Sequence, residues 1–395
     1  MIQSVGAAWL MTELTRSHVL IALVQASATI PIMLFGVFAG AIADNFDRRR
    51  VMLAAQAGML VFSALLALLT GAGAITPALL LVMTLGVGTG TAINAPAWQA
   101  SVRKTVGPRD LAQAISLNTI AFNLARSVGP ALGGLLISLT STSAAFAVNA
   151  VSYLAMIVVL MRWRPEHSPQ DARRERRPML AAIGEGVRYC ARSSPIRRIL
   201  ARGLVIGFGV AGYQALLPAV ARDRLHGSEI EYGLLLGAFG VGSILIALVV
   251  GRARRRWGSE AVVGAATIAF ILAELIIARA TALPLALAAT FLAGAGWVAA
   301  MTSLNIAMQL RSPEAMLGRC LSLYQAVTFG GMALGAYAWG ALADAISLTF
   351  AINAAAVWLG VTLIAMRLLA PMPGRAEGRI EVEQPSRSPP NPGAT

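Results

Sequence analysis

The sequence predicts an all-α protein that crosses a membrane many times and consists of two similar halves of six helices each. Three observations predict this fold class. Hydrophobic residues make up 57% of the chain and charged residues 13%, and the mean hydropathy is +0.70. Long apolar stretches follow one another along the chain, and parts of the first half recur in the second. A soluble domain of this composition would expose too much apolar surface to stay dispersed.

Eleven apolar stretches, each bounded by charged or turn residues, come close to the roughly 20 residues that a bilayer requires. We expect helices at 19–43, 51–71, 76–99, 111–138, 143–162, 197–221, 230–250, 259–279, 283–307, 316–343 and 347–369. A twelfth stretch, residues 2–14, is too short to cross, so we expect it to be part of a truncated first helix. No basic segment or small-residue cleavage site precedes it, which argues against a signal peptide.

The net charge of +14 follows the expected topology and not a single surface. Alternate loops, the linker and the C-terminal tail hold 27 of the 32 basic residues. Because basic residues concentrate in cytoplasmic loops, we expect both termini in the cytoplasm of a multi-pass protein of the cell inner (plasma) membrane. The basic residues therefore form no separate surface that could bind nucleic acid. The expected partners are the lipid bilayer and a small-molecule substrate, and we expect a monomer.

An internal repeat supports two halves related by an axis along the membrane normal. The stretch Ala145–Ala150, Ala-Phe-Ala-Val-Asn-Ala, recurs as Thr-Phe-Ala-Ile-Asn-Ala at Thr349–Ala354. Between the halves, Met179 to Cys190 has an apolar side and is expected to lie along the membrane surface. We therefore expect an N-terminal half (1–162), a cytoplasmic linker with an amphipathic helix (163–196), a C-terminal half (197–370) and a disordered, Pro- and Ser-containing tail (371–395).

One charged loop follows the apolar run 19–43. Gly40, Ala43, Asp44 and the basic run Arg48–Arg50 resemble the signature loop of the major facilitator superfamily, Gly-x-Leu-Ala-Asp-Arg-x-Gly-Arg-Arg. Asn45 and Asp47 depart from it, and Asp47 in place of the second glycine resembles the bacterial enterobactin exporter and macrolide efflux subgroup. The matching place in the second half, Gly251–Gly258, has Arg255 where the aspartate should stand. The resemblance implies a twelve-helix facilitator fold and transport by alternating access.

The resemblance also implies a gating role for Gly40, Asp44, Arg48 and Arg49. Asp44 would pair with Arg48 in only one of two arrangements of the halves, and so act as a latch of the outward-facing state. In the alternative, the arginines only set the topology and Asp44 caps a helix.

Arg126 lies well inside the predicted helix 111–138. A central arginine costs roughly 2.5–3.5 kcal/mol on insertion scales, so a purely lipid-facing position is excluded. Thr119, Asn123, Arg126 and Pro130 share one stripe of the helix, which we expect to line the central cavity. Arg126 is therefore a candidate counter-charge for an anionic or catechol-type substrate, or a group that exchanges partners during coupling. The alternative is a structural arginine that only ties two helices together.

Gly129, Pro130, Gly133 and Gly134 resemble the antiporter motif Gly-Pro-x-x-Gly-Gly of the fifth helix. The resemblance implies an exporter sealed against leak. Ordinary close packing of small residues is the alternative, because proline kinks a helix and glycine lets two backbones approach.

Proton coupling is implied by the resemblance alone. The carboxylates Glu13, Glu274 and Asp344 fall near the outer ends of predicted helices, where they offer no site in the middle of the membrane. A membrane enzyme is the rival class. However, His18, His167 and His226 show no metal-ligand spacing, and no phosphate-binding Gly-x-x-x-x-Gly-Lys-Ser/Thr loop occurs. We expect Cys190 and Cys320 to lie far apart on the cytoplasmic side. We expect no enzyme, no metal and no cofactor.

The sequence thus predicts a secondary active transporter that exports a siderophore or another secondary metabolite, by antiport with protons. Arg126 favours this substrate class because it attracts partial negative charge. Multidrug or macrolide efflux, with drug resistance as its consequence, is the alternative, because apolar cavity walls and the same motifs also suit amphipathic drugs.

Overall fold

The computed structural model describes residues 2–105, 111–163, 179–313 and 316–372, and these ranges contain helices and no strands. The helices are α1 (Ile2–Leu14), α2 (His18–Asn45), α3 (Arg48–Gly71), α4 (Pro77–Thr105), α5 (Leu111–Leu139), α6 (Thr142–Arg162), α7 (Met179–Arg192), α8 (Ser194–Asp223), α9 (Glu229–Ile277), α10 (Leu283–Gln309), α11 (Leu317–Ala345) and α12 (Leu348–Leu369).

Within the described ranges, nine helices are long and apolar enough to cross a membrane. The described end of α5 adds the apolar stretch Val128–Leu139. Helix α9 covers both predicted spans 230–250 and 259–279, which meet directly at Gly258. The backbone of Gly258 has φ 82° and ψ 164°, a conformation that glycine adopts without the clash of a Cβ. The two spans are therefore confirmed, but no irregular loop separates them.

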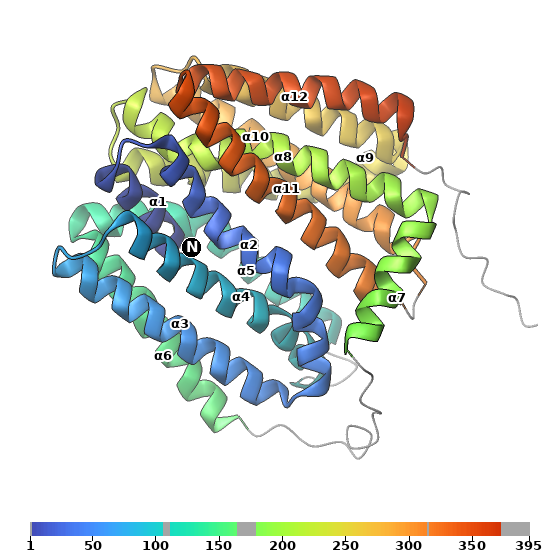
Figure 1. Ribbon diagram of the computed structural model, residues 1–395, viewed down its shortest axis with the longest axis horizontal. Helices are drawn as coiled ribbons and strands as arrows, with labels where there is room; N and C mark the ends of the chain where they lie inside the picture. Colours follow the sequence, from blue (N-terminus) through green and yellow to red (C-terminus); the bar gives the residue numbers. More distant parts are fainter. Residues whose placement is uncertain (1, 106–110, 164–178, 314–315, 373–395) are drawn as a thin grey trace, which may run out of the picture.

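The helices form two groups, α1–α6 and α8–α12, which lie side by side in Figure 1. In the first group α3 packs against α4 and α6, and α2 against α4. In the second group α8 packs against α11 and α12, and α9 against α10 and α12. This is the predicted fold of two six-helix halves, with α9 counted as two spans. The exact domain boundaries stay a prediction.

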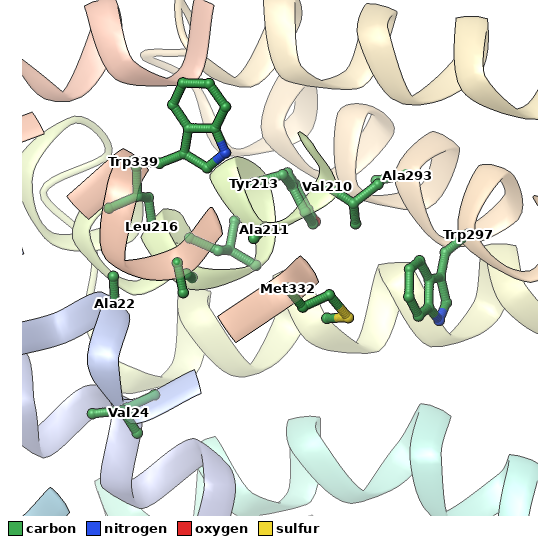
Figure 2. Packing of buried hydrophobic residues seen from close by; sticks show 14 of the residues in the cluster. Ala22, Val24, Val210, Ala211, Tyr213, Leu216, Ala293, Trp297, Met332 and Trp339 are labelled. Carbon is green, nitrogen blue, oxygen red and sulfur yellow. The ribbon is translucent and has the colours of Figure 1, made fainter. Parts of the chain in front are cut away.

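The halves meet mainly through two helix pairs, α2 with α11 and α5 with α9, and α2 also packs against α8. Helix α1 also packs between α5 and α6 on one side and α8 and α9 on the other. Most buried apolar side chains belong to one cluster that includes residues of both halves. Figure 2 shows Leu216 of α8 and Trp339 of α11 in this cluster, with Ala22 of α2 close by. The core therefore continues across the contact between the halves.

Helix α7 occupies the stretch predicted for the amphipathic helix of the linker, and it packs against α8 and α11. Glu185 pairs with Arg319 of α11 at 2.8 Å. The prediction that the two cysteines lie far apart is wrong: because α7 packs against α11, the buried Cys190 thiol lies 3.6 Å from that of Cys320. This hydrogen bond raises the pKa of the Cys190 thiol. Ile183 is half-buried and Val187 is exposed.

Other predicted features of the linker and tail stay untested. The position of α7 relative to the membrane is a prediction, and the predicted tail and most of the polar linker lie outside the described residues.

Candidate functional site at the contact between the halves

The end of the molecule where α1 joins α2, here called the α1–α2 end, carries a polar cluster that connects the halves. Its members are Ser17 and His18 of the first half and Arg222, Asp223 and Asp344 of the second; we call it the His18 cluster. The His18 ring lies between two carboxylates. Its Nδ1 is 2.9 Å from Asp344 Oδ1 and its Nε2 is 3.2 Å from Asp223 Oδ2.

Asp344, at the end of α11, also caps the start of α2. Its carboxylate accepts hydrogen bonds from the backbone amides of His18 (2.6 Å) and Val19 (3.1 Å) and from the Ser17 hydroxyl (2.7 Å). The first amides of a helix have no partner within the helix, and the positive end of the helix dipole favours an acidic group there. The first helical turn of α2 thus depends on a side chain of the other half.

Arg222, at the end of α8, binds the carboxyl end of α1. Its guanidinium donates to the backbone carbonyls of Thr12 and Thr15, where α1 ends, and to its neighbour Asp223. A cation at the carboxyl end of a helix is favourable for the same electrostatic reason. The side-chain exposures of His18 and Asp223, 19% and 28%, show that the cluster is partly shielded from water, which strengthens the ion pair of Arg222 with Asp223.

Close backbone contacts accompany the cluster between α2 and α11. A Cβ placed on Gly340 of α11 would lie 3.0 Å from the Ala22 Cβ and from the Val19 Cα of α2. Further along the same helix pair, a Cβ on Gly330 would meet only the flexible Met33 side chain, at 2.8 Å from its sulfur. Of these two glycines, only Gly340, near the α1–α2 end, lies close to the backbone of α2.

The glycines predicted for an antiporter motif make the second contact. A Cβ on Gly134 of α5 would collide with the Glu229 carbonyl of α9 and lie 3.2 Å from the Gly233 Cα. Conversely, a Cβ on Gly233 would lie 3.0 Å from the Pro130 carbonyl oxygen. Gly133, next to Gly134, instead faces α1, where the Ile2 Cα would be 3.2 Å from its Cβ. The motif thus packs α5 against both α9 and α1.

The signature loop lies at the opposite end, here called the linker end. Asp47 is the N-cap of α3 and its side chain accepts from the Arg50 amide at 2.9 Å. Arg49 donates to the carbonyls of Leu160 and Met161 at the end of α6, each at 2.7 Å.

Several predicted site residues lie in described helices, but their side chains are outside the described part of the structure. Gly40 and Asp44 belong to the last turns of α2, and Thr119, Asn123 and Arg126 to α5. The latch between Asp44 and Arg48 and the cavity-lining role of Arg126 therefore stay predictions.

No pattern in the sequence predicts the His18 cluster, because its members are far apart in the chain and show no regular spacing. Glu274 lies near the outer end of its helix, as predicted, but its side chain is completely buried. The sequence does contain one signal for Glu274, because an acidic residue within a membrane-spanning segment is rare and often functional. Among the described residues, no group of three or more His, Cys, Asp or Glu side chains could hold a metal ion.

Comparison with known proteins adds family information. A family model described as a transmembrane secretion effector (MFS_3) matches residues 1–389. The chain is similar to the multidrug efflux pump Tap of Mycolicibacterium fortuitum, with 29% identity over 371 residues, 90% of this chain and 89% of Tap. It is similar to the enterobactin exporter EntS of Shigella boydii serotype 18, with 28% identity over 335 residues, 84% of this chain and 78% of EntS.

A further relative is the staphyloferrin A transporter of Staphylococcus aureus, with 24% identity over 252 residues. That match covers 63% of this chain and 62% of the relative, so the chain spans less than two thirds of its length.

Solved transporters share the fold. The nucleoside transporter NupG superposes with a TM-score of 0.72 at 13% identity, covering 92% of this chain and 95% of NupG. A bacterial homologue of the human lysosomal transporter Spinster, in an inward-facing and unoccupied conformation, gives 0.69 at 15% identity, covering 94% and 95%. At such identities the likeness shows the fold alone.

Proposed function

Because the chain belongs to the transmembrane secretion effector family of the major facilitator superfamily, we propose that it exports a siderophore or another secondary metabolite by alternating access. The family is one of transporters and not of enzymes. The observation that carries the proposal is the similarity to the enterobactin exporter over 84% of the chain. The staphyloferrin A transporter is a second relative whose name includes a siderophore.

Arg126 is the residue we propose for substrate selection. Siderophores carry carboxylate or catecholate oxygens, and an arginine recognises such oxygens with charge-assisted hydrogen bonds. We propose that Arg126, Asn123 and Thr119 lie along the substrate path, since they share one stripe of α5. Support for this comes from the cost of an arginine within a membrane helix, which is normally met only at a polar or functional position.

Multidrug efflux is the second candidate. It is favoured by the similarity to the Tap pump, which has 29% identity and covers 90% of this chain. An amphipathic drug needs apolar walls more than a counter-charge, so this candidate gives Arg126 only a structural role.

The transport cycle that we propose has protons as the coupling ion and a monomer in the cell inner membrane as the working unit. The distribution of basic residues supports an orientation with both termini and the linker end in the cytoplasm. The moving units would be residues 1–162 and 197–370, joined by the linker 163–196 and followed by the tail 371–395.

In this orientation the His18 cluster closes the outside. It joins the halves at one end only, together with the close contact of Gly340 with α2. Rocking of the halves would break the cluster, and the latch of Asp44 with Arg48 would replace it at the linker end. Such an exchange of one set of contacts for another defines two discrete states.

The test is uptake driven by a pH gradient into inside-out vesicles, with a catecholate siderophore and a cationic dye as probes. We expect Arg126→Met to lose siderophore uptake and to keep most dye uptake, because only the anionic probe needs the counter-charge. Arg188→Met, on the exposed side of α7, is the matched control and should transport both probes normally.

Dye uptake that is strong in the unaltered protein and indifferent to Arg126, without siderophore uptake, would replace metabolite export by multidrug efflux. Equal loss of both probes in Arg126→Met would make the arginine a structural residue. Absence of pH-driven uptake for every probe would contradict proton-coupled export.

A further inference from the structure

One carboxyl group is buried inside the second half without a partner. Glu274, in the second segment of α9, has 0% exposure, and neither of its side-chain oxygens has a hydrogen-bond partner. It lies three residues before Ile277, the last residue of the helix, on the side of the α1–α2 end. At 1.5 Å per residue, it is roughly 5 Å from that helix end.

Four other carboxylates of the second half have partners among the residues that the structure describes. Glu260 pairs with the buried Arg202 at 2.9 Å, and Asp223 and Asp344 belong to the His18 cluster. Glu231 accepts a hydrogen bond from the Ser228 amide at 2.7 Å. Glu274 differs from these four carboxylates. The cost of an unpaired carboxylate in an apolar interior is so large that such a group holds a proton instead.

The surroundings of Glu274 are helix backbone, apolar side chains and hydroxyl groups. Helix α8 faces it with Gly212, whose Cβ, if present, would lie 3.6 Å from Glu274 Oε1, and α12 meets the same glycine through Ala355. The titratable group next to Gly212 on α8 is the buried Tyr213, whose ring packs edge-on against Phe270, about one helical turn before Glu274, with 5.6 Å between ring centroids. Helix α10 contributes Thr290, whose hydroxyl donates to its own helix.

A path of aromatic side chains connects Glu274 to the contact between the halves. The Tyr213 ring stacks on that of Phe239 in the first segment of α9, with 6.2 Å between ring centroids and 17° between planes, and Tyr232 precedes Phe239 in the same segment. The Tyr232 ring stacks on Trp9 of α1, with 6.2 Å between ring centroids and 24° between planes. Trp9 belongs to the first half. A change around Glu274 can therefore reach the surface that must separate when the α1–α2 end opens.

From this placement we propose that Glu274 binds the coupling proton of the transport cycle. The inference rests on the proposed function, since it assigns a residue to the proton of that cycle. With the α1–α2 end closed, as in this structure, Glu274 is neutral and the halves stay packed through Trp9 and Tyr232. During a cycle the O–H bond of the carboxyl breaks, the proton passes to water on the cytoplasmic side, and the carboxylate later takes a proton from water outside.

Infrared spectroscopy of the purified protein near neutral pH tests the proton itself. The spectrum of the unaltered protein minus that of Glu274→Gln should contain the carbonyl band of a protonated carboxyl. The control difference with Glu185→Gln should lack this band, because the Glu185 side chain is 57% exposed and pairs with Arg319. Glutamine has nearly the same shape as glutamic acid, and Glu274→Asp, which keeps a titratable group, serves as a second variant if the first fails to fold.

Transport measurements test whether this proton takes part in coupling. In proteoliposomes, Glu274→Gln should lose substrate uptake driven by a pH gradient. The variant should keep transport of substrate driven only by the concentration gradient of the substrate. Gradient-driven uptake at the unaltered level, or no carboxyl band in the difference spectrum, would overturn the proposal. If the unaltered protein shows no pH-driven uptake, the proposed coupling fails on its own, and the infrared band still reports whether Glu274 holds a proton.

Discussion

At the scale of single residues, two side chains near the signature loop show how charges complete helix ends. Asp47 accepts from the Arg50 amide at the start of α3. Arg49 donates hydrogen bonds to two carbonyls at the end of α6, which have no partners within that helix. These contacts stay within the first half. They give the loop a structural role in addition to the gating role that its resemblance to the family implies.

Replacement of Arg49 should therefore weaken the first half. We expect Arg49→Met to lower the free energy of unfolding by about 1–2 kcal/mol, because two charge-assisted hydrogen bonds are lost and one of their acceptors belongs to the buried Leu160. Thermal unfolding of the purified protein measures this change. Arg50→Met, at an exposed position of the same run, is the control. Equal effects of the two variants would mean that the carbonyl contacts of Arg49 contribute little.

The residue scale also shows where prediction from sequence ended. The departure of Asp47 from the family pattern was visible in the sequence, but its role as a helix cap follows only from the geometry. Glu274 was placed correctly near a helix end. Its complete burial could not be predicted, because it depends on how α8, α9 and α12 pack, and a glycine at position 212 leaves the space.

At the scale of helices, apolar length was a reliable guide. The predicted span 283–307 corresponds to α10 (Leu283–Gln309), and 143–162 to α6 (Thr142–Arg162). The connection at Gly258 was not predicted, because the charged run before it looks like a loop and is helical in the structure. A positive φ at one glycine is sufficient to turn the chain between two membrane segments.

At the scale of helices, the antiporter-like motif of α5 makes a close backbone contact with α9. Gly134→Ala would place a methyl group against the Glu229 carbonyl, which is backbone and cannot rotate away. We expect a loss of about 1–3 kcal/mol in the free energy of unfolding, as for other overpacked contacts, together with slower transport. Thermal unfolding and vesicle uptake measure the two effects.

The matched control is Gly58→Ala in α3. A Cβ there meets nothing within 4 Å, so the substitution should leave stability unchanged or raise it by up to about 1 kcal/mol through the better helix propensity of alanine. If Gly134→Ala behaved like this control, α5 and α9 would be able to move apart at no cost. The motif would then be ordinary small-residue packing without a sealing role.

At the scale of the whole molecule, the His18 cluster is the feature that no local sequence pattern announces. The contacts of the His18 ring with Asp344 and Asp223 join α2 to the ends of α11 and α8, hundreds of residues away in the chain. The internal repeat predicted two halves but not which charges would tie them. Contacts of this kind depend on the relative position of the halves, which changes during transport, and for this reason they report on the conformational state.

A cysteine in place of Ala22 gives a reporter of that state. Ala22 has 0% exposure and lies against Gly340 in the contact of α2 with α11. In a background without Cys190 and Cys320, a membrane-impermeant maleimide added from outside can reach this position only when the α1–α2 end opens. The labelling rate therefore measures how often the outer contact separates.

Asp344→Asn should increase this labelling rate. The substitution removes the negative charge that pairs with His18 and that caps the first turn of α2, so the state closed at the α1–α2 end loses stability relative to the open state. For the matched control, Glu231→Gln removes a carboxylate at the same end of the molecule whose hydrogen bond stays within the second half, and labelling should not change.

Equal labelling in the unaltered protein and Asp344→Asn would mean that the glycine contacts alone hold this end closed. A shared increase in both variants would point instead to general loosening of the second half. An increase confined to Asp344→Asn would identify the cluster as the outer gate, because only the contact between the halves distinguishes the two carboxylates.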